Sequence, residues 1–355
     1  MPLHASDLSD LSSLFTDTRS SLESKTILLT GSSGLIGGYL LECLLHIAEY
    51  SALRFSLILT TRQQILPQLA PPSNLTIFYI YCDFADPISL QSLALKYSST
   101  VDIVFHCASP SSPKAYTSEP FSTFATNSTS LQYLLSTLNY TDTSFSPKFF
   151  FFSTTGVYGK HPPQDYPLDE FSQCHLVSTD LGSIYNVSKI AGEQILSHAA
   201  HIHGICLYIL RLNINYGPGI NLNDGRALSD FLNDARSGVD VRLRSLGAQT
   251  RNYLYLSDTI AAIFMLLNQV HSSCTVNLSH HVDTSIRELA SCIAHLYGVK
   301  IILPDCSFTH SGIDFDQTSV DCSQLQRLTG WFPAISLHEG LERLINTLDT
   351  FSSTL

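Results

Sequence analysis

The feature that most constrains the fold of this chain is a glycine-rich segment, residues 30–37, with the sequence Thr-Gly-Ser-Ser-Gly-Leu-Ile-Gly. It directly follows an apolar run of strand type and opens a helix-like stretch. In this strand–turn–helix context the glycines allow backbone N–H groups to approach a pyrophosphate closely, at the positive end of the helix dipole. The segment therefore predicts a dinucleotide site. The residues expected to contact the cofactor are Gly31, Ser33, Gly34, Leu35, Ile36 and Gly37.

From Lys25 onward, short apolar runs alternate with longer helix-like stretches, which favours a parallel sheet covered by helices. The expected strands are 26–29, 55–60, 76–81, 101–106, 148–153 and 205–210. The expected helices include 36–50, 123–138 and 185–198. The predicted fold class is α/β, a Rossmann-type doubly wound parallel sheet with a smaller C-terminal substrate-binding lobe.

The domain boundaries expected from this pattern divide the chain into three parts. Residues 25–212 form the dinucleotide-binding domain, to which a later helix near 258–270 returns. Beyond residue 212 the alternation weakens, so 213–355 is expected to form mainly the substrate-binding lobe, at the carboxyl ends of the strands. Residues 1–24 are interpreted as a leader, either mobile or a short docking helix.

Composition restricts the partners of the protein. A formal net charge of −11 opposes non-specific attraction to nucleic acid. No apolar run approaches the roughly 20 residues that span a bilayer, and no secretory signal is apparent. Nine cysteines are scattered without a CxxC pair, which favours reduced thiols and a cytoplasmic location. The histidines lack partners at ligand spacing, so no metal site is expected.

A second motif, Tyr185-Asn-Val-Ser-Lys189, places a phenol and an ammonium on one face of a helix. A nearby Lys⁺ and a positively charged nicotinamide favour the phenolate, which then serves as a base toward a hydroxyl group. Thr154 ends a strongly apolar strand at the ligand edge of the sheet and supplies a third polar group. These three residues form a candidate catalytic set.

The identity of the dinucleotide depends on the end of the second strand. An NAD site usually carries an acidic residue there, but the sequence is Leu-Thr-Thr-Arg62. Arg62 fits a 2′-phosphate, so both NAD and NADP remain candidates, and a solvated surface arginine is the alternative. Asp83 and Phe84, after the third strand, suit the adenine, although Asp83 equally fits a simple turn.

Together these motifs resemble the extended short-chain dehydrogenase/reductase, or NAD-dependent epimerase/dehydratase, family from Lys25 onward. Segments 104–116 and 216–258 are most similar to UDP-glucuronate decarboxylases and related nucleotide-sugar enzymes. The resemblance implies that Thr154 binds the reacting hydroxyl, Tyr185 is the acid/base and Lys189 holds the nicotinamide ribose. It also implies cofactor contacts from Ala108, Ser109 and Asn127, and substrate contacts from Pro110, Tyr116, Thr155, Asn215, Arg226 and Arg251.

The sequence also departs from this family. Where related enzymes carry a carboxylate two residues after Thr154, this chain has Gly156, which disfavours 4,6-dehydration and weakens decarboxylation. The expected activity is transient oxidation at the sugar C4, leading to epimerisation or decarboxylation of a nucleotide sugar. The alternatives are an NADPH-dependent keto-sugar reductase and a catalytically silent dinucleotide-binding scaffold. The resemblance also implies a homodimer formed through helices 123–138 and 185–198.

Overall fold

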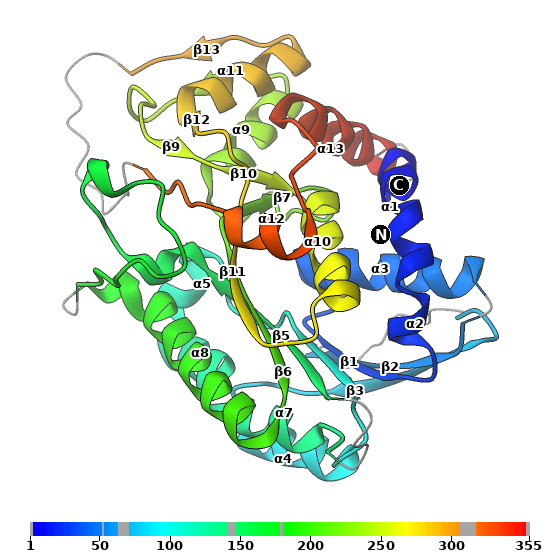
Figure 1. Cartoon of the computed structure of the whole chain (residues 1–355). Helices are drawn as coiled ribbons and strands as arrows, with labels where there is room; N and C mark the ends of the chain where they lie inside the picture. Colours follow the sequence, from blue (N-terminus) through cyan, green and yellow to red (C-terminus); the bar gives the residue numbers. More distant parts are fainter. Residues whose placement is uncertain are drawn as a thin grey trace.

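The computed structural model describes residues 3–51, 53–62, 71–140, 146–177, 180–304 and 317–352. Its centre is a seven-stranded, fully parallel sheet (Figure 1). The strands are β1 (Thr26–Thr30), β2 (Phe55–Thr61), β3 (Leu75–Tyr81), β4 (Ile103–His106), β5 (Lys148–Thr154), β6 (Cys206–Leu212) and β11 (Cys274–Leu278). Their order, β11-β6-β5-β4-β1-β2-β3, reverses direction between β1 and β4, as in a Rossmann-type sheet. The predicted fold class is therefore confirmed.

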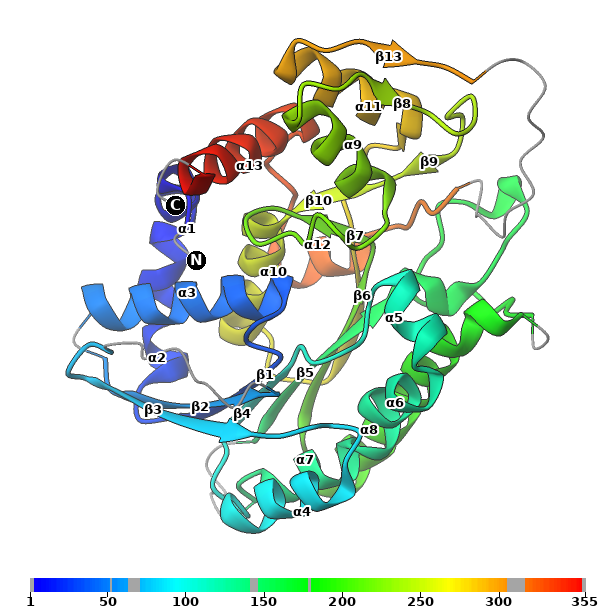
Figure 2. The same cartoon turned by 180° about the vertical axis from the view of Figure 1, so that it is seen from behind.

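Helices cover both faces of this sheet (Figures 1 and 2). Alternate side chains of each strand point to opposite faces, so Ile27 and Leu29 join one core and Leu28 the other. The first face is covered by α3 (Leu35–Tyr50) and α10 (Leu256–Gln269). The second is covered by α4 (Pro87–Lys96), α7 (Leu131–Thr137) and α8 (Ile184–His203). Burial on both faces explains why the strands are continuous apolar runs.

A smaller lobe with its own core lies at the opposite end of the molecule from α4 and α7 (Figures 1 and 2). Its helices are α9 (Ala227–Arg236), α11 (Ile286–Tyr297) and α13 (Leu337–Ser352). Its short strands pair as β7 (Ile214–Tyr216) with β10 (Tyr253–Tyr255), β8 (Val241–Arg242) with β13 (Ile301–Ile302), and β9 (Thr250–Arg251) with β12 (Thr284–Ser285).

Two parts of the expected partition differ from the structure. Residues 213–355 were assigned mainly to the substrate lobe, with one helix near 258–270, now α10, returning to the first domain. In the structure β11 also returns, to the edge of the central sheet. The helix α12 (Ser323–Thr329) packs against α10 and β11. The expected helix 123–138 is three pieces: α6 (Pro120–Phe124), a π-helical turn (Ala125–Thr129) and α7. A further short helix, α5 (Pro113–Ser118), precedes them.

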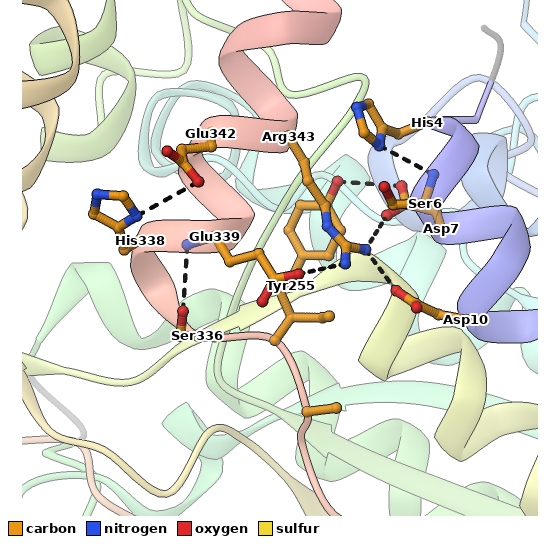
Figure 3. A network of polar contacts seen from close by, with 12 residues as sticks. His4, Ser6, Asp7, Asp10, Tyr255, Ser336, His338, Glu339, Glu342 and Arg343 are labelled. Atoms are coloured by element: carbon orange, nitrogen blue, oxygen red, sulfur yellow. Dashed lines mark hydrogen bonds and ion pairs between the residues drawn. The ribbon is translucent and has the colours of Figure 1, made fainter.

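Within the leader, residues 5–22 form two helices, α1 (Ala5–Asp17) and α2 (Arg19–Leu22). Leu11 is buried against the core that includes α10. Nearer the start of α1, the Arg343 guanidinium of α13 donates to Asp7 Oδ1 at 2.8 Å and to Asp10 Oδ2 at 2.6 Å (Figure 3). The Tyr255 hydroxyl of β10 donates to Asp7 Oδ2 at 3.1 Å. The leader thus connects the first lobe to the second.

Among the described residues, no helix combines the length and the apolar character that crossing a membrane requires.

Candidate active site

The glycine loop is shaped by close backbone approach. Gly31 has φ +66°, and a Cβ there would lie 2.6 Å from the backbone nitrogen of Ala108. A Cβ on Gly37 would lie 2.8 Å from the carbonyl carbon of Gly31 and collide with its oxygen. Gly34 caps α3 without a side-chain hydrogen bond, so the first amides of the helix remain available to an anion. These features fit the pyrophosphate of a dinucleotide.

A cavity of about 370 Å³ extends from this loop past the end of β5 and the start of α8 to the second lobe. It brings together residues that are far apart in the sequence, as the carboxyl edge of an open α/β sheet is expected to do. The predicted residues that line it are Gly34, Leu35, Ile36, Gly37, Ser109, Tyr116, Thr154, Thr155, Tyr185, Lys189, Asn215, Arg226 and Arg251.

Lys189 lies one helical turn after Tyr185 on α8, with its Nζ 5.7 Å from the centre of the Tyr185 ring. The ammonium donates to the backbone oxygen of Phe152 in β5 at 2.7 Å, which fixes the side chain against the strand that ends in Thr154. Burial lowers the pKa of Lys189 to about 7, and the nearby Cys107 and Glu193 oppose this shift. Lys189 is therefore poised to gain or lose its charge near neutral pH.

Tyr185 stacks on Tyr116, with ring centres 5.4 Å apart and planes inclined by 20°. Burial raises the pKa of Tyr185 to about 12, whereas the charge of Arg226 and a hydrogen bond with Ser109 lower it. The expected lowering by Lys189 is thus not the dominant influence in the protein alone, because burial disfavours the phenolate more strongly. Deprotonation of Tyr185 requires additional positive charge in the cavity.

Thr154 and the loop after it complete the polar floor of the cavity. The Thr154 hydroxyl accepts a hydrogen bond from the backbone N–H of Gly156 at 3.1 Å, which starts a 3₁₀ turn at Thr155–Tyr158. Its Oγ1 thus lies at the end of β5, and its own proton is available to a ligand. The neighbouring Thr155 also lines the cavity.

Asn127 was predicted to contact the cofactor but lies behind the cavity. It is fully buried, and its Oδ1 accepts from Ser109 Oγ at 2.8 Å while its Nδ2 donates to Ser188 Oγ at 3.0 Å. The amide therefore connects the loop after β4 to α8, and acts on the cavity through Ser109.

Other predicted residues lie outside the residues that line the cavity. Phe84 is buried against His106, and the Asp83 carboxylate accepts from the Ala85 N–H at 2.9 Å, as in a simple turn. Arg62 is exposed directly after β2. Gly31, Ser33, Ala108 and Pro110 belong to the two loops around the cavity but not to its lining.

Sequence analysis missed a buried histidine beneath the glycine loop. His106 Nδ1 and Thr30 Oγ1 are 2.9 Å apart, and Thr30 Oγ1 accepts from the Ala108 N–H at 3.1 Å. Burial lowers the pKa of His106 to about 3, so it is neutral and holds the ends of β1 and β4 together. Its place at the end of a buried strand, directly before the loop, was the available signal.

The charged side chains among the described residues that line the cavity are all basic. Of the described residues that line it, Lys189, Arg226 and Arg251 are the basic ones, and neither Asp nor Glu is among them. Arg226 donates to the Ser111 backbone oxygen at 2.6 Å and Arg251 to that of Thr250 at 2.7 Å, which holds both guanidinium groups in place. The cavity thus suits an anionic ligand.

Known proteins resemble this chain in sequence and in fold. The chain is 27% identical over 325 residues to UDP-glucuronic acid decarboxylase 1 of Xenopus tropicalis, covering 91% of this chain and 72% of the relative. It resembles UDP-glucose 4-epimerase of Thermotoga maritima in fold, at a TM-score of 0.74 and 21% identity, covering 92% and 99% of the two chains. The structure of UDP-glucuronic acid 4-epimerase of Bacillus cereus, solved with UDP-glucuronic acid and NAD, matches this chain with a TM-score of 0.72 and 22% identity. The match covers 92% of this chain and 99% of the epimerase.

The model of the NAD dependent epimerase/dehydratase family matches residues 27–279, which include the glycine loop, Thr154, Tyr185, Lys189 and both arginines. The chain therefore belongs to the NAD-dependent epimerase/dehydratase family.

Proposed function

We propose that this protein oxidises C4 of a nucleotide-linked sugar transiently, with NAD or NADP held in the glycine loop, and then forms an epimer or a decarboxylated product. One observation carries the proposal. A single cavity connects the glycine loop to Thr154, Tyr185 and Lys189 and continues to Arg226 and Arg251. A nucleotide sugar needs this combination of an oxidation site and a remote anion site.

The chain's own residues account for the proton in this reaction. The Tyr185 phenolate takes the proton of the sugar hydroxyl while Thr154 donates a hydrogen bond to the same oxygen. With a dinucleotide bound, its nicotinamide ring would supply the acceptor for the hydride that leaves C4. The C4–H and O–H bonds break, and the C4=O bond forms. Burial raises the pKa of Tyr185 and the charge of Arg226 lowers it. A protonated Lys189 and the positive charge of a bound, oxidised nicotinamide would favour the phenolate further.

The charge of the cavity favours a nucleotide-linked uronic acid as the sugar. Three basic residues and no described carboxylate line the cavity, which suits a diphosphate together with a sugar carboxylate. The relative from Xenopus tropicalis is named for UDP-glucuronic acid, and the Bacillus cereus epimerase was solved with this compound. UDP-glucuronate is therefore the first substrate to test.

The product depends on the step after oxidation. A 4-keto-uronate is a β-keto acid, which loses CO₂ without a second acid/base group. Return of hydride to the other face of C4 also needs no carboxylate, whereas elimination of water does. The glycine at position 156 is compatible with the first two outcomes, so epimerisation and decarboxylation both remain in the proposal.

A reductase that consumes NADPH is the second candidate. It is favoured by Arg62, which is exposed at the end of β2 where a 2′-phosphate would lie. The two candidates differ in cofactor stoichiometry, because a reductase consumes one NADPH per product and the epimerase or decarboxylase consumes none.

The test is product analysis by NMR and mass spectrometry after incubation with UDP-glucuronate and other nucleotide sugars, with NAD, NADP or NADPH supplied separately. An isomer or a product lighter by CO₂, with no net cofactor consumption, supports the proposal. Tyr185→Phe should abolish turnover and retain cofactor binding, whereas Tyr50→Phe, at an exposed ring at the end of α3, should change neither. Stoichiometric loss of NADPH would replace the proposal with the reductase.

We further infer a homodimer in the cytoplasm. Exposed apolar side chains lie on α6 and α8, including Phe121, which is 90% exposed, Val187 and Ile202. Such a surface suits a helical interface with a second copy. Every cysteine among the described residues is free, which suits a reducing compartment. Light scattering after gel filtration tests the dimer, and a monomeric mass at micromolar concentration would contradict it.

A further inference from the structure

Gly156 and Asn186 lie against one another at the floor of the cavity. A Cβ on Gly156 would be 2.9 Å from Asn186 Cγ and 3.1 Å from Nδ2, and closer still to Oδ1. The carboxamide therefore occupies the space that any side chain at position 156 would need. Gly156 does not have a positive φ, so a side chain at this position would act mainly by displacing the Asn186 carboxamide from its present place.

The Asn186 carboxamide has unused hydrogen-bonding capacity. Within the described part of the chain it has no hydrogen-bond partner, although it lines the cavity and is partly buried. By contrast, the amide of Asn215, which lines the same cavity, donates to the Asn213 backbone oxygen and accepts from the Thr259 hydroxyl. A side-chain amide offers two N–H donors and one acceptor oxygen. Asn186 follows Tyr185, the expected acid/base, directly in the sequence, and both residues line the cavity.

We propose that Asn186 is a specificity-determining residue, whose Nδ2 donates to the carboxylate on C5 of the sugar ring, next to the reacting C4. The inference rests on the proposed function and narrows the substrate class to nucleotide-linked uronic acids. A carboxylate accepts hydrogen bonds and donates none, so an amide donor suits it. Because Gly156 has no side chain, the Asn186 amide can lie against the backbone at this position.

The test compares UDP-glucuronate with UDP-glucose, which differ only in that the first carries a carboxylate at C6. We would titrate both into NAD-saturated protein by calorimetry and measure KM and kcat wherever turnover occurs. Asn186→Ala should weaken UDP-glucuronate binding about tenfold to a hundredfold through the loss of a hydrogen bond to a charged group, and UDP-glucose binding by less than about threefold. Asn186→Asp should weaken UDP-glucuronate binding still more relative to UDP-glucose, because it places a negative charge next to the sugar carboxylate.

Two further variants separate this role from a folding defect. Gly156→Ala forces the amide away from its position, so it should reproduce the altered preference of Asn186→Ala. Gln194→Ala, at an exposed position on the same helix, should leave both affinities unchanged. Equal losses for the two sugars in Asn186→Ala, or an unchanged preference, would overturn the inference.

Failure of the proposed function has a different signature. If the wild type prefers UDP-glucuronate in binding but turns over no nucleotide sugar, C4 oxidation fails while the binding role of Asn186 stands. If the wild type oxidises a nucleotide sugar but shows no preference for the uronate, the role of Asn186 fails alone. If it binds neither sugar, both are overturned.

Discussion

Replacing Arg343 by Met should destabilise the whole protein, because this arginine connects the two lobes through α1 (Figure 3). Its side chain is 9% exposed and that of Asp7 is 0% exposed, and the two are joined at 2.8 Å. Methionine retains most of the aliphatic packing of arginine but removes the charge. The Asp7 carboxylate then keeps the Tyr255 hydroxyl as a donor but loses its cation.

The magnitude follows from burial. Removing one partner of a buried ion pair costs about 3–5 kcal/mol, because the other charge remains desolvated. Asp10 and Glu339, the other partners of Arg343, are 42% and 46% exposed, so each adds less than about 1 kcal/mol. We expect a loss of about 3–5 kcal/mol in the free energy of unfolding. At about 2 °C per kcal/mol for a large chain, Tm should fall by about 6–10 °C.

The assay is urea and thermal unfolding followed by circular dichroism, with two comparison variants. Arg244→Met breaks the ion pair between Arg244 and Asp230, whose arginine is 84% exposed, and should cost less than about 1 kcal/mol. The double variant Asp7→Asn with Arg343→Met removes both buried charges and should recover part of the loss. A Tm change in Arg343→Met no larger than that in Arg244→Met would refute the argument that this buried pair holds the lobes together.

Three further predictions concern Lys189 and the expected cofactor contacts. Relative to Lys189→Met, the free energy of unfolding of the wild type should rise between pH 7 and 10.5, because Lys189 is neutral in the folded protein over this range and protonated in the unfolded chain. Urea titrations at several pH values measure this difference, and a difference that does not change with pH would contradict the lowered pKa of Lys189. Gly37→Ala should abolish cofactor binding, measured by fluorescence titration, since its Cβ collides with Gly31. Arg62→Ala should weaken NADP binding at least tenfold and leave NAD binding unchanged if Arg62 contacts a 2′-phosphate, and equal effects on both cofactors would exclude that role.

Most of the central sheet could be predicted from the sequence because its strands are buried on both faces. The run Phe149 to Phe152 is continuous and apolar, so both its place and its end at Thr154 follow from composition alone. β11 was missed because Cys274–Leu278 is short and contains polar residues such as Thr275 and Asn277. Its burial depends on contacts with distant residues that no local pattern reveals.

The position of the leader could not be predicted for the same reason. The buried carboxylate of α1, Asp7, is compensated by Arg343, which lies 336 positions later. A sequence pattern does not reveal an ion pair at such a separation.

In the candidate site, too, the residues with fixed local spacing could be predicted, whereas those that depend on long-range packing could not. The glycine loop, Tyr185 and Lys189 have fixed local spacing, and the structure brings them into one cavity as expected. Asn127 was assigned from the family resemblance and Phe84 from its place after the third strand, and their side chains make buried contacts with Ser109 and His106. The packing of Asn186 over Gly156 involves two segments 30 positions apart and was visible only in three dimensions.

The most direct test of C4 oxidation uses UDP-glucuronate that carries deuterium at C4, with NAD and the wild-type protein. During turnover, acid quenching followed by mass spectrometry should find deuterium on the nicotinamide, and the final product should again carry deuterium at C4 with no net cofactor consumed. The Tyr185→Phe variant should transfer no deuterium. A product that forms without deuterium ever reaching the nicotinamide would contradict the account.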